Sequence, residues 1–175
     1  DDLRLQELWK NHLEGKNSLG IIPITETNTC TWGAIDIDQY PLNHSDLVTK
    51  FIKTNKLPFV IARSKSGGAH VFLFTKDYVS ASLMQDKLNE IRSVLGYGGS
   101  EVFPKQRELK SKDDTGNFLN LPYFNCSNTT RYAFLENGEA ATLDSFFELV
   151  ERYKQEDIST IAVSYTHLTL PTSFE

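Results

Sequence analysis

Cysteine is scarce in this sequence, and long hydrophobic runs are missing from it. The 175 residues include two cysteines, Cys30 and Cys126, and neither has a second cysteine or a histidine at metal-ligand spacing. Two lone thiols cannot build a four-ligand zinc site, and their isolation favours buried free thiols over a disulfide. No apolar stretch approaches the roughly 20 residues that a membrane-spanning helix needs, and no signal peptide is visible. We therefore expect a cytoplasmic protein without a membrane partner.

Positive charge is also in deficit, with 18 lysines and arginines against 23 aspartates and glutamates and a formal net charge of −5. A net negative charge opposes strong non-specific binding to duplex DNA. The basic residues cluster at 63–65 and 105–112, however, so a local positive groove can exist on a negatively charged protein. A hydrophobic content of 39% and a charged content of 23% are typical of a globular domain that is long enough to bury a core.

Hydrophobic periodicity predicts a mixture of helices and short strands. Apolar stripes at helical spacing, which we interpret as core, predict helices over residues 2–14, 45–57, 80–95 and from 142 onward. Short β-rich runs predict strands at 19–24, 32–37, 58–63, 69–75, 100–104, 117–122 and 131–136. The pair Asn137-Gly138 is typical of a tight turn. This mixture predicts an α+β fold in which a twisted sheet carries the functional site.

Two carboxylates at the end of one predicted strand are the most informative feature. The run Thr31–Asp38 is apolar enough for a buried strand, yet it ends in Asp36 and Asp38. Side chains two residues apart on a strand share a face and lie roughly 7 Å apart. Like charges held so close repel and lose hydration, and a divalent cation such as Mg²⁺ or Mn²⁺ removes that cost. The alternative is a strand end whose two carboxylates simply face water.

A basic loop with tandem glycines separates the strands predicted at 58–63 and 69–75. Glycines let backbone N–H groups approach an anion without a Cβ in the way, and basic and hydroxyl side chains add charge and donors. The alternative is a Gly-Gly hairpin with solvated basic residues and a strand-end histidine whose hydrogen bonds are satisfied. The groups that would suit a nucleoside triphosphate are Arg63, Ser64, Lys65, Ser66, Gly67, Gly68 and His70.

Later segments add polar groups among apolar residues. Glu101 opens a short apolar run and could serve as a third metal ligand or a proton acceptor. Lys105 and Gln106 follow a proline and supply a cation and an amide. Asn117 and Asn120 are amides among large apolar residues, where an unpaired polar group is costly. Alternatively, each of these residues is an ordinary loop residue or a buried amide with satisfied hydrogen bonds.

The order and spacing of these blocks resemble the catalytic domain of the archaeo-eukaryotic primase superfamily. That superfamily is marked by an Asp-x-Asp/Glu strand, a Ser-x-His-type motif on the next hairpin and a later carboxylate after a hydrophobic residue. The chain is similar to the primase domains of the TOTE conflict systems and related phage primases over about residues 5–150. The blocks that carry the resemblance are Leu19–Asp38, Arg63–Val71, Phe103–Gln106 and Gly116–Pro122.

The resemblance implies a two-lobed fold, in which an α/β unit joins a sheet unit like an RNA-recognition motif and the active site lies in the cleft between them. It also implies a template-directed nucleotidyltransferase, a DNA primase or primase-polymerase that uses NTPs or dNTPs on single-stranded DNA. Asp36, Asp38 and Glu101 would hold two Mg²⁺ or Mn²⁺ ions, and His70 would belong to the catalytic set. The expected contacts to nucleotide or template are Arg63, Ser64, Lys65, Ser66, Gly67, Gly68, His70, Lys105, Gln106, Asn117 and Asn120.

Two features depart from the superfamily's pattern. The third carboxylate is commonly Asp there and is Glu101 here, and Ser66 lies four residues before His70, in the loop rather than on the strand. Two other functions stay open: a non-catalytic single-stranded nucleic-acid-binding domain of the same fold, and a metal-dependent nuclease or replication initiator. The second needs paired histidine ligands and a nucleophilic tyrosine, whereas only His70 lies among the blocks.

The C-terminal residues 163–175 resemble the translation of a sequencing adapter. We therefore expect a catalytic domain over residues 1–162, an incomplete fragment without an initiating methionine, and we leave His167 out of every site. The alternative is a genuine threonine-rich strand. The resemblance further implies a prokaryotic, phage or mobile-element origin and a fused or associated helicase or nuclease outside this fragment.

Overall fold

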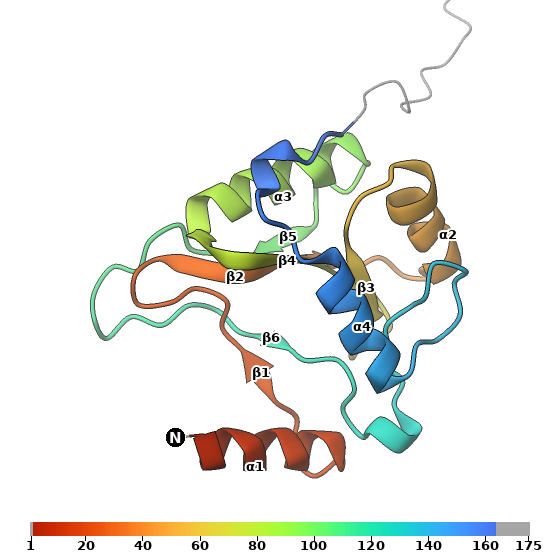
Figure 1. Ribbon diagram of the computed structural model, residues 1–175, viewed down its shortest axis with the longest axis horizontal. Coiled ribbons are helices and arrows are strands. Elements are labelled where there is room, and N and C mark those ends of the chain that lie inside the picture. Colours follow the sequence, from red (N-terminus) through yellow and green to blue (C-terminus); the bar gives the residue numbers. More distant parts are fainter. Residues whose placement is uncertain (1, 164–175) are drawn as a thin grey trace, which may run out of the picture.

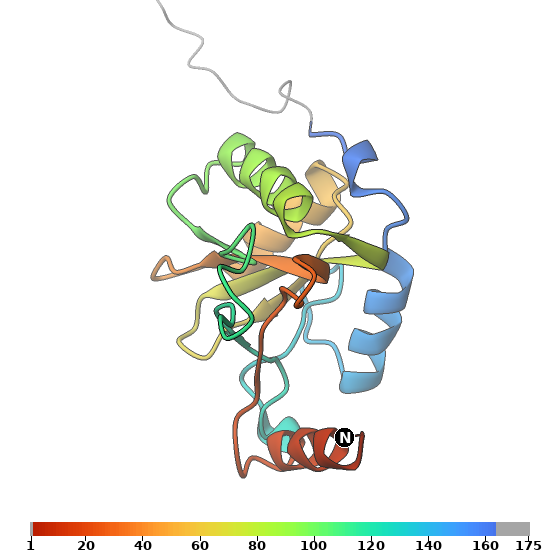
Figure 2. The ribbon, with the colours of Figure 1, turned by 90° about the vertical axis from the view of Figure 1, so that its left-hand side faces the viewer.

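The computed structural model describes residues 2–163, which form two antiparallel sheets flanked by helices (Figures 1 and 2). The strands are β1 Gly20–Ile21, β2 Thr29–Ile37, β3 Val60–Arg63, β4 Ala69–Ser80, β5 Glu101–Phe103 and β6 Leu119–Asn120. The helices are α1 Asp2–Leu13, α2 His44–Val48 with its π-helical continuation η1 Thr49–Thr54, α3 Ala81–Val94 and α4 Leu143–Tyr153. Two 3₁₀ turns, η2 Cys126–Asn128 and η3 Ile158–Thr160, complete the set.

The larger sheet has the strand order β3-β4-β2-β5, and all neighbouring strands are antiparallel. Along the chain its elements run β2-α2-β3-β4-α3-β5, which is the split βαβ arrangement. Residues of α2, η1 and α3 share one core cluster, so the helices of this unit cover the same face of the sheet. The predicted α+β fold, with a sheet unit like an RNA-recognition motif, is confirmed.

Alternation along β2 decides which residues meet which helices, because successive side chains of a strand point to opposite faces. Ile35 and Ile37 are fully buried in the core beneath α2, η1 and α3. Ala34 and Asp36 therefore belong to the opposite face, as the sequence predicted. On that face Phe72, Phe103, Tyr123 and residues of α4 form the second core cluster around Ala34.

The smaller sheet and α1 lie on the opposite side of the larger sheet from α3 (Figures 1 and 2). β1 and β6 pair antiparallel, with Gly20 opposite Asn120. The fully buried His12 attaches α1 to this ribbon. Its Nδ1 accepts from the Leu19 N–H at 2.9 Å, so the ring proton is on Nε2, which donates to the Pro122 carbonyl at 2.8 Å.

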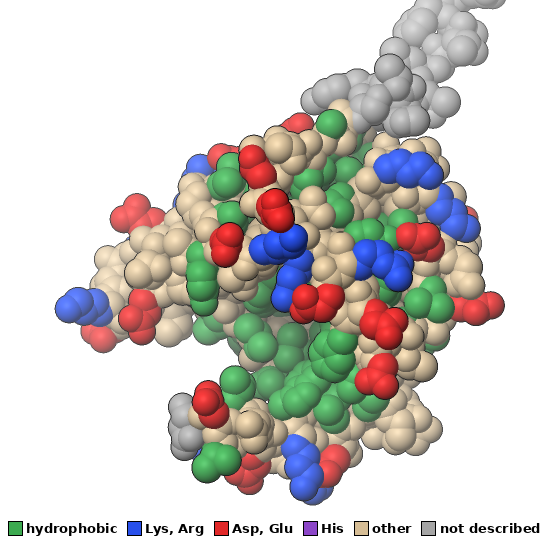
Figure 3. All heavy atoms as spheres, in the orientation of Figure 1, with side chains coloured by type: hydrophobic (Ala, Val, Ile, Leu, Met, Phe, Trp, Pro, Cys, Tyr) green, Lys and Arg blue, Asp and Glu red, His purple; other side chains and the backbone are tan. Residues whose placement is uncertain are grey.

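The apolar stripe of α1 is covered only near its C-terminal end, where Leu13 packs against the second core cluster, and its interpretation as core is wrong for Leu5 and Leu8. Leu5 is 56% exposed and Leu8 is 36% exposed, because α1 rests on the narrow β1–β6 ribbon and not on the larger sheet. A hollow of about 410 Å³ lies beside the helix, and Figure 3 shows hydrophobic side chains gathered there. Its lining residues are Leu5, Gln6, Trp9, Leu19, Ile21, Leu121 and Phe147.

Helix starts were predicted well, and one strand was not. Ser80 caps α3 by accepting from the Leu83 N–H, and Thr142 caps α4 by accepting from the Ser145 N–H. The strand predicted at 131–136 is absent from the described structure, where this segment makes only isolated bridges, from Ala133 to Ala62 and from Phe134 to Ala140. The segment is therefore extended at these two positions without forming a continuous strand.

Both cysteines are free, as predicted. Burial in β2 raises the pKa of the Cys30 thiol to about 11, so this thiol stays protonated and unreactive at neutral pH. Cys126 is only half-buried, which differs from the expectation of two buried thiols.

The last described residues pack against α3. Ile158, Ile161 and Val163 belong to the core cluster of that face, so packing reaches one residue past the boundary predicted at 162. The adapter interpretation covers residues 163–175: Val163 is described and packs in this cluster, and residues 164–175 lie outside the described residues. Within residues 2–163, every helix is too short or too polar to cross a membrane.

Candidate active site

The ends of all four strands meet at one end of the larger sheet. Asp36, near the end of β2, lies opposite His70 of β4 on one side and Glu101 of β5 on the other. Arg63 ends β3 and lies opposite Ala69, so its side chain leaves the sheet on the other face from His70, whose partner on β3 is Ala62. Cross-strand partners share a face and have Cβ atoms about 4.5–5.5 Å apart. The register therefore brings Asp36, His70 and Glu101 together on the face that carries α4.

The side chain of Asp36 is 15% exposed, and its buried Oδ1 has no hydrogen-bond partner among residues 2–163. This oxygen lies 3.4 Å from His70 Nε2, within ion-pair distance when the imidazole is protonated, but the two atoms do not form a hydrogen bond. His70 is held edge-on against Phe72, with ring centroids 6.0 Å apart. Buried polar atoms are nearly always paired in folded proteins, so this oxygen marks a place for a donor or a cation.

Asp38 lies just beyond β2 and is exposed. The Tyr40 hydroxyl donates to Asp38 Oδ1 at 3.2 Å and is also hydrogen-bonded to the Ser66 hydroxyl. Ser66 Oγ lies 3.5 Å from the buried Ser64 hydroxyl. A chain of hydroxyls thus joins Asp38 to the loop between β3 and β4.

The loop of residues 64–68 is a tight turn. The Ser64 N–H donates to the Gly68 carbonyl and the Gly67 N–H donates to the Ser64 carbonyl, both at 3.1 Å. Gly67 has a φ of +92°, which favours glycine. A Cβ on Gly68 would lie 2.3 Å from the Ile37 carbonyl oxygen. Both glycines therefore shape the loop, and the Gly67 N–H that the sequence assigned to an anion is engaged within the turn.

Arg63 is anchored at the base of this loop. Its Nε donates to the Thr130 carbonyl at 3.1 Å, and its Nη1 lies 3.3 Å from Nδ1 of His44, the first residue of α2. Nε2 of His44 lies 2.8 Å from the Gly68 carbonyl oxygen. Lys65 is exposed within the loop. Two cations therefore lie in or beside the loop that Tyr40 connects to Asp38.

Glu101 is opposite Asp36, but its carboxylate pairs with a lysine. Glu101 Oε2 lies 3.1 Å from Lys105 Nζ, and this ammonium also lies over the Phe103 ring at 5.3 Å from its centroid. Across residues 2–163 no group of three or more Asp, Glu, His or Cys side chains is placed to hold a metal ion. Mg²⁺ is commonly bound by one or two carboxylates together with substrate phosphates. Asp36 and Asp38 are the carboxylates that such a shared site would use.

The remaining predicted residues fall in two further places. Gln106 and Asn117 pair through their side-chain amides, and the Asn117 N–H also donates to Gln106 Oε1 at 3.2 Å. The segment before Gln106 is anchored to α3, because Gln85 Nε2 donates to the Pro104 carbonyl at 2.8 Å. Asn120 lies on β6 in the smaller sheet. The structure joins the Phe-Pro-x-Gln and Gly-Asn blocks, but it places Asn120 on a different sheet from Asp36.

Sequence reasoning missed Tyr40 and His44. Tyr40 contacts a residue 26 positions away, and His44 contacts one 24 positions away. Local patterns do not reveal such contacts. The position of Tyr40 two residues after Asp38 is a weak local signal, and His44 has none beyond its place at a helix start.

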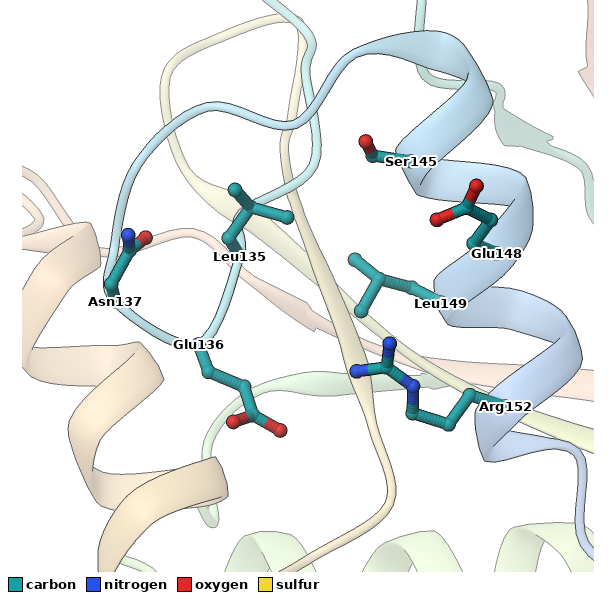
Figure 4. Close-up of a pocket in the computed structure, with 7 residues that line it drawn as sticks. All are labelled: Leu135, Glu136, Asn137, Ser145, Glu148, Leu149 and Arg152. Carbon is teal, nitrogen blue, oxygen red and sulfur yellow. The ribbon is translucent and has the colours of Figure 1, made fainter.

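Three hollows on the described surface lie away from these residues. One of about 300 Å³ separates the turn at 135–138 from α4, and Figure 4 shows Leu149 and Arg152 extending from α4 toward the turn that carries Glu136. The second is the apolar hollow beside α1. The third, of about 630 Å³, lies beside Tyr78. None of these three is lined by a predicted site residue, so a cleft at Asp36 stays a prediction.

Comparison with known proteins agrees with the order of the sequence blocks. No match to this chain was found among curated proteins. The family model described as the archaeo-eukaryotic primase domain of the TOTE conflict system matches residues 4–161. That match includes every predicted site residue from Asp36 to Asn120, and domains of this family are generally nucleotidyltransferases. The chain therefore belongs to the archaeo-eukaryotic primase domain family of the TOTE conflict systems.

Proposed function

We propose that this domain is a primase-polymerase, a template-directed nucleotidyltransferase that makes primers on single-stranded DNA from NTPs or dNTPs. The family match supports a primase-like nucleotidyltransferase. One observation supports the end of β2 as the reaction site: the buried Asp36 Oδ1 lacks a hydrogen-bond partner among the described residues and is flanked by His70 and Glu101.

Asp36 and Asp38 would hold divalent ions, Mg²⁺ or Mn²⁺. Glu101 would join them through rotation of its own side chain away from Lys105, because its backbone is already opposite Asp36. The chemistry that two such ions supply is activation of the primer 3′-hydroxyl and stabilisation of the leaving pyrophosphate. Asp36 suits this role because β2 is hydrogen-bonded on both sides, which fixes the backbone that carries the carboxylate.

The loop beside these carboxylates would bind the triphosphate. Arg63 can contact phosphate oxygens at two points, and Lys65 adds a second positive charge. The hydroxyls of Ser64 and Ser66 would donate to the same phosphates, and His70 would orient Asp36 from the neighbouring strand. Contacts to the base or to the template strand fall to Lys105, Gln106, Asn117 and Asn120.

This reaction requires a single-stranded template as a partner. Because the net charge of the protein is −5, local basic groups would have to bind the template. A helicase or nuclease, fused or associated, would expose the template in the cytoplasm of the host cell.

Nucleotide incorporation tests the proposal. The full chain is incubated with a primed or an unprimed single-stranded template, Mn²⁺ or Mg²⁺, and labelled NTPs or dNTPs. We expect extension by the wild type and none above background for Asp36→Asn, which keeps the shape of the side chain. The thermal melting temperature of Asp36→Asn without metal should hold or rise, because the substitution removes a largely buried charge whose Oδ1 has no hydrogen-bond partner among the described residues.

Asp77→Asn is the matched control, because Asp77 is an exposed carboxylate on β4 outside the site. It should extend primers as the wild type does. Retained incorporation in Asp36→Asn would contradict the assignment. Template binding without incorporation by the wild type would favour the non-catalytic binding domain, and degradation of the template would favour the nuclease.

A further inference from the structure

A buried histidine that the sequence did not predict, His44, supports the loop between β3 and β4. It is 8% exposed and begins α2, where Asn43 caps the helix by accepting from the Asp46 N–H at 3.1 Å. Its ring stacks on Phe134, with centroids 5.2 Å apart and 20° between the planes. The helix start and the stacked ring hold the imidazole in place from one side.

Both ring nitrogens of His44 are used on the other side. The Gly68 carbonyl oxygen can only accept, so the His44 Nε2, 2.8 Å away, carries the ring proton. In the neutral ring Nδ1 is then an acceptor, and it faces the Arg63 Nη1 donor at 3.3 Å. These two contacts use the full hydrogen-bonding capacity of a neutral imidazole.

The two contacts act on the two ends of the loop. Arg63 immediately precedes residues 64–68, and Gly68 closes them through the bond from the Ser64 N–H. The Arg63 guanidinium is directed by two acceptors, His44 Nδ1 and the Thr130 carbonyl. Its Nη2 then lies near Gly67, where a built Cβ would be 3.6 Å away. The guanidinium is thus held beneath the turn.

We propose that His44 is a positioning residue for nucleotide binding: it holds the Arg63 guanidinium and the Gly68 end of the loop in the geometry that accepts a triphosphate. The inference rests on the proposed function for the identity of the ligand. A guanidinium that is already oriented loses less side-chain freedom when it binds a phosphate. Loss of His44 therefore weakens nucleotide binding and leaves the chemical step unchanged.

Two substitutions separate the roles of the ring. His44→Phe keeps an aromatic ring for Phe134 and removes both hydrogen bonds, whereas His44→Gln keeps an amide donor for the Gly68 carbonyl. Lys53→Gln, on the exposed side of η1, is the control. The dissociation constant for a dNTP is measured by calorimetry, and the KM and kcat of incorporation are measured on a primed template.

We expect His44→Phe to raise the dissociation constant and KM about tenfold with kcat nearly unchanged, the scale of one hydrogen bond to a charged group. His44→Gln should recover part of the loss, and Lys53→Gln should match the wild type. In a double-mutant cycle His44→Phe should cost less in the Arg63→Ala background than in the wild type, because one of its two lost contacts acts through the guanidinium that Arg63→Ala removes.

Loop order gives a readout that does not depend on the ligand. Lys65 is an exposed trypsin site within the loop, and its cleavage should be several-fold faster in His44→Phe at a temperature where melting curves show the variant folded. His44→Gln serves the same test if His44→Phe does not fold.

Two failures are distinguishable. Wild-type protein that binds no nucleotide contradicts the proposed function. An unchanged dissociation constant in the His44 variants, or unchanged cleavage at Lys65, overturns the positioning role even where Arg63→Ala weakens nucleotide binding.

Discussion

At the scale of single residues, the end of β2 is in close contact with the backbone of the loop at Gly68. The Gly68 backbone lies so close to the Ile37 carbonyl that the loop and the strand share a contact surface without a side chain between them. Ile37 lies between Asp36 and Asp38, so this contact fixes the loop relative to both proposed metal ligands. The sequence predicted that Gly67 and Gly68 let backbone N–H groups approach an anion. The structure shows that Gly68 is also needed for close packing against Ile37.

Gly68→Ala should therefore destabilise the protein and impair nucleotide binding together. The added Cβ would lie 2.3 Å from the Ile37 carbonyl oxygen, and relief requires movement of backbone. We expect a loss of about 1–3 kcal/mol in the free energy of unfolding, measured by urea denaturation. Gly99→Ala is the control, because a Cβ there meets nothing within 4 Å, and it should change stability by less than about 0.5 kcal/mol. Equal effects of the two substitutions would contradict the packing role.

At the scale of elements, α1 is attached chiefly at its C-terminal end. His12 joins it to Leu19 and Pro122, Trp9 stacks on the His12 ring with centroids 5.5 Å apart, and the outer apolar residues stay exposed. Burial lowers the pKa of His12, the hydrogen bond to the Pro122 carbonyl opposes this, and the charge of Arg131 lowers it further. The attachment of α1 therefore depends on a neutral imidazole.

Acid should loosen this attachment. Below the unfolded-state pKa of about 6.5 the unfolded chain binds a proton that folded His12 does not, so stability is full above that pH. It falls as the pH drops from about 6.5 toward the lowered folded pKa, by at most about 1.4 kcal/mol per pH unit. Urea denaturation at pH 7.5 and 5.5, followed by tryptophan fluorescence, measures the difference. His12→Gln cannot titrate, so an equal pH dependence in this variant and the wild type would refute the role of His12.

The sequence predicted helices and strands correctly where a local rule determines the start of a helix or the face of a strand. The two-residue period of a strand puts Ile35 and Asp36 on opposite faces, and the helices predicted at 80–95 and from 142 onward begin where Ser80 and Thr142 cap α3 and α4. Two predictions were wrong: the burial of the apolar stripe of α1 and the strand at 131–136. Both depend on distant parts of the chain, which decide what covers a helix and what pairs with a strand. The pairing register that places Glu101 opposite Asp36 also depends on distant parts of the chain, so no local pattern in the sequence predicts it.

At the scale of the whole molecule, the C-terminal segment completes the core over α3. Ile158 and Ile161 are buried there, and Lys87 of α3 donates to the Ile161 carbonyl at 2.9 Å. Val163 is the last described residue of this cluster. The described core thus includes side chains from residue 30 to residue 163.

Two truncations test where the packed chain ends. A chain that stops after Val163 should melt as the full chain does, because the adapter interpretation, moved by one residue to exclude the packed Val163, makes residues 164–175 foreign to the fold. A chain that stops after Asp157 loses three buried aliphatic side chains and should lose at least about 3 kcal/mol. Calorimetric melting of both chains gives the comparison. A large loss of stability in the chain that stops after Val163 would mean that the tail is a native part of the fold.

The position of β2 inside the larger sheet separates the proposed site into two parts with different opening free energies. The backbone at Asp36 is laddered to β4 and β5, and its exposure requires the sheet to come apart, at nearly the cost of global unfolding. The 64–68 loop is closed by two backbone hydrogen bonds and the contacts of His44, so it opens locally at much lower cost. On the proposed function, a nucleotide would enter and pyrophosphate would leave on the loop side while Asp36 and Glu101 keep their register.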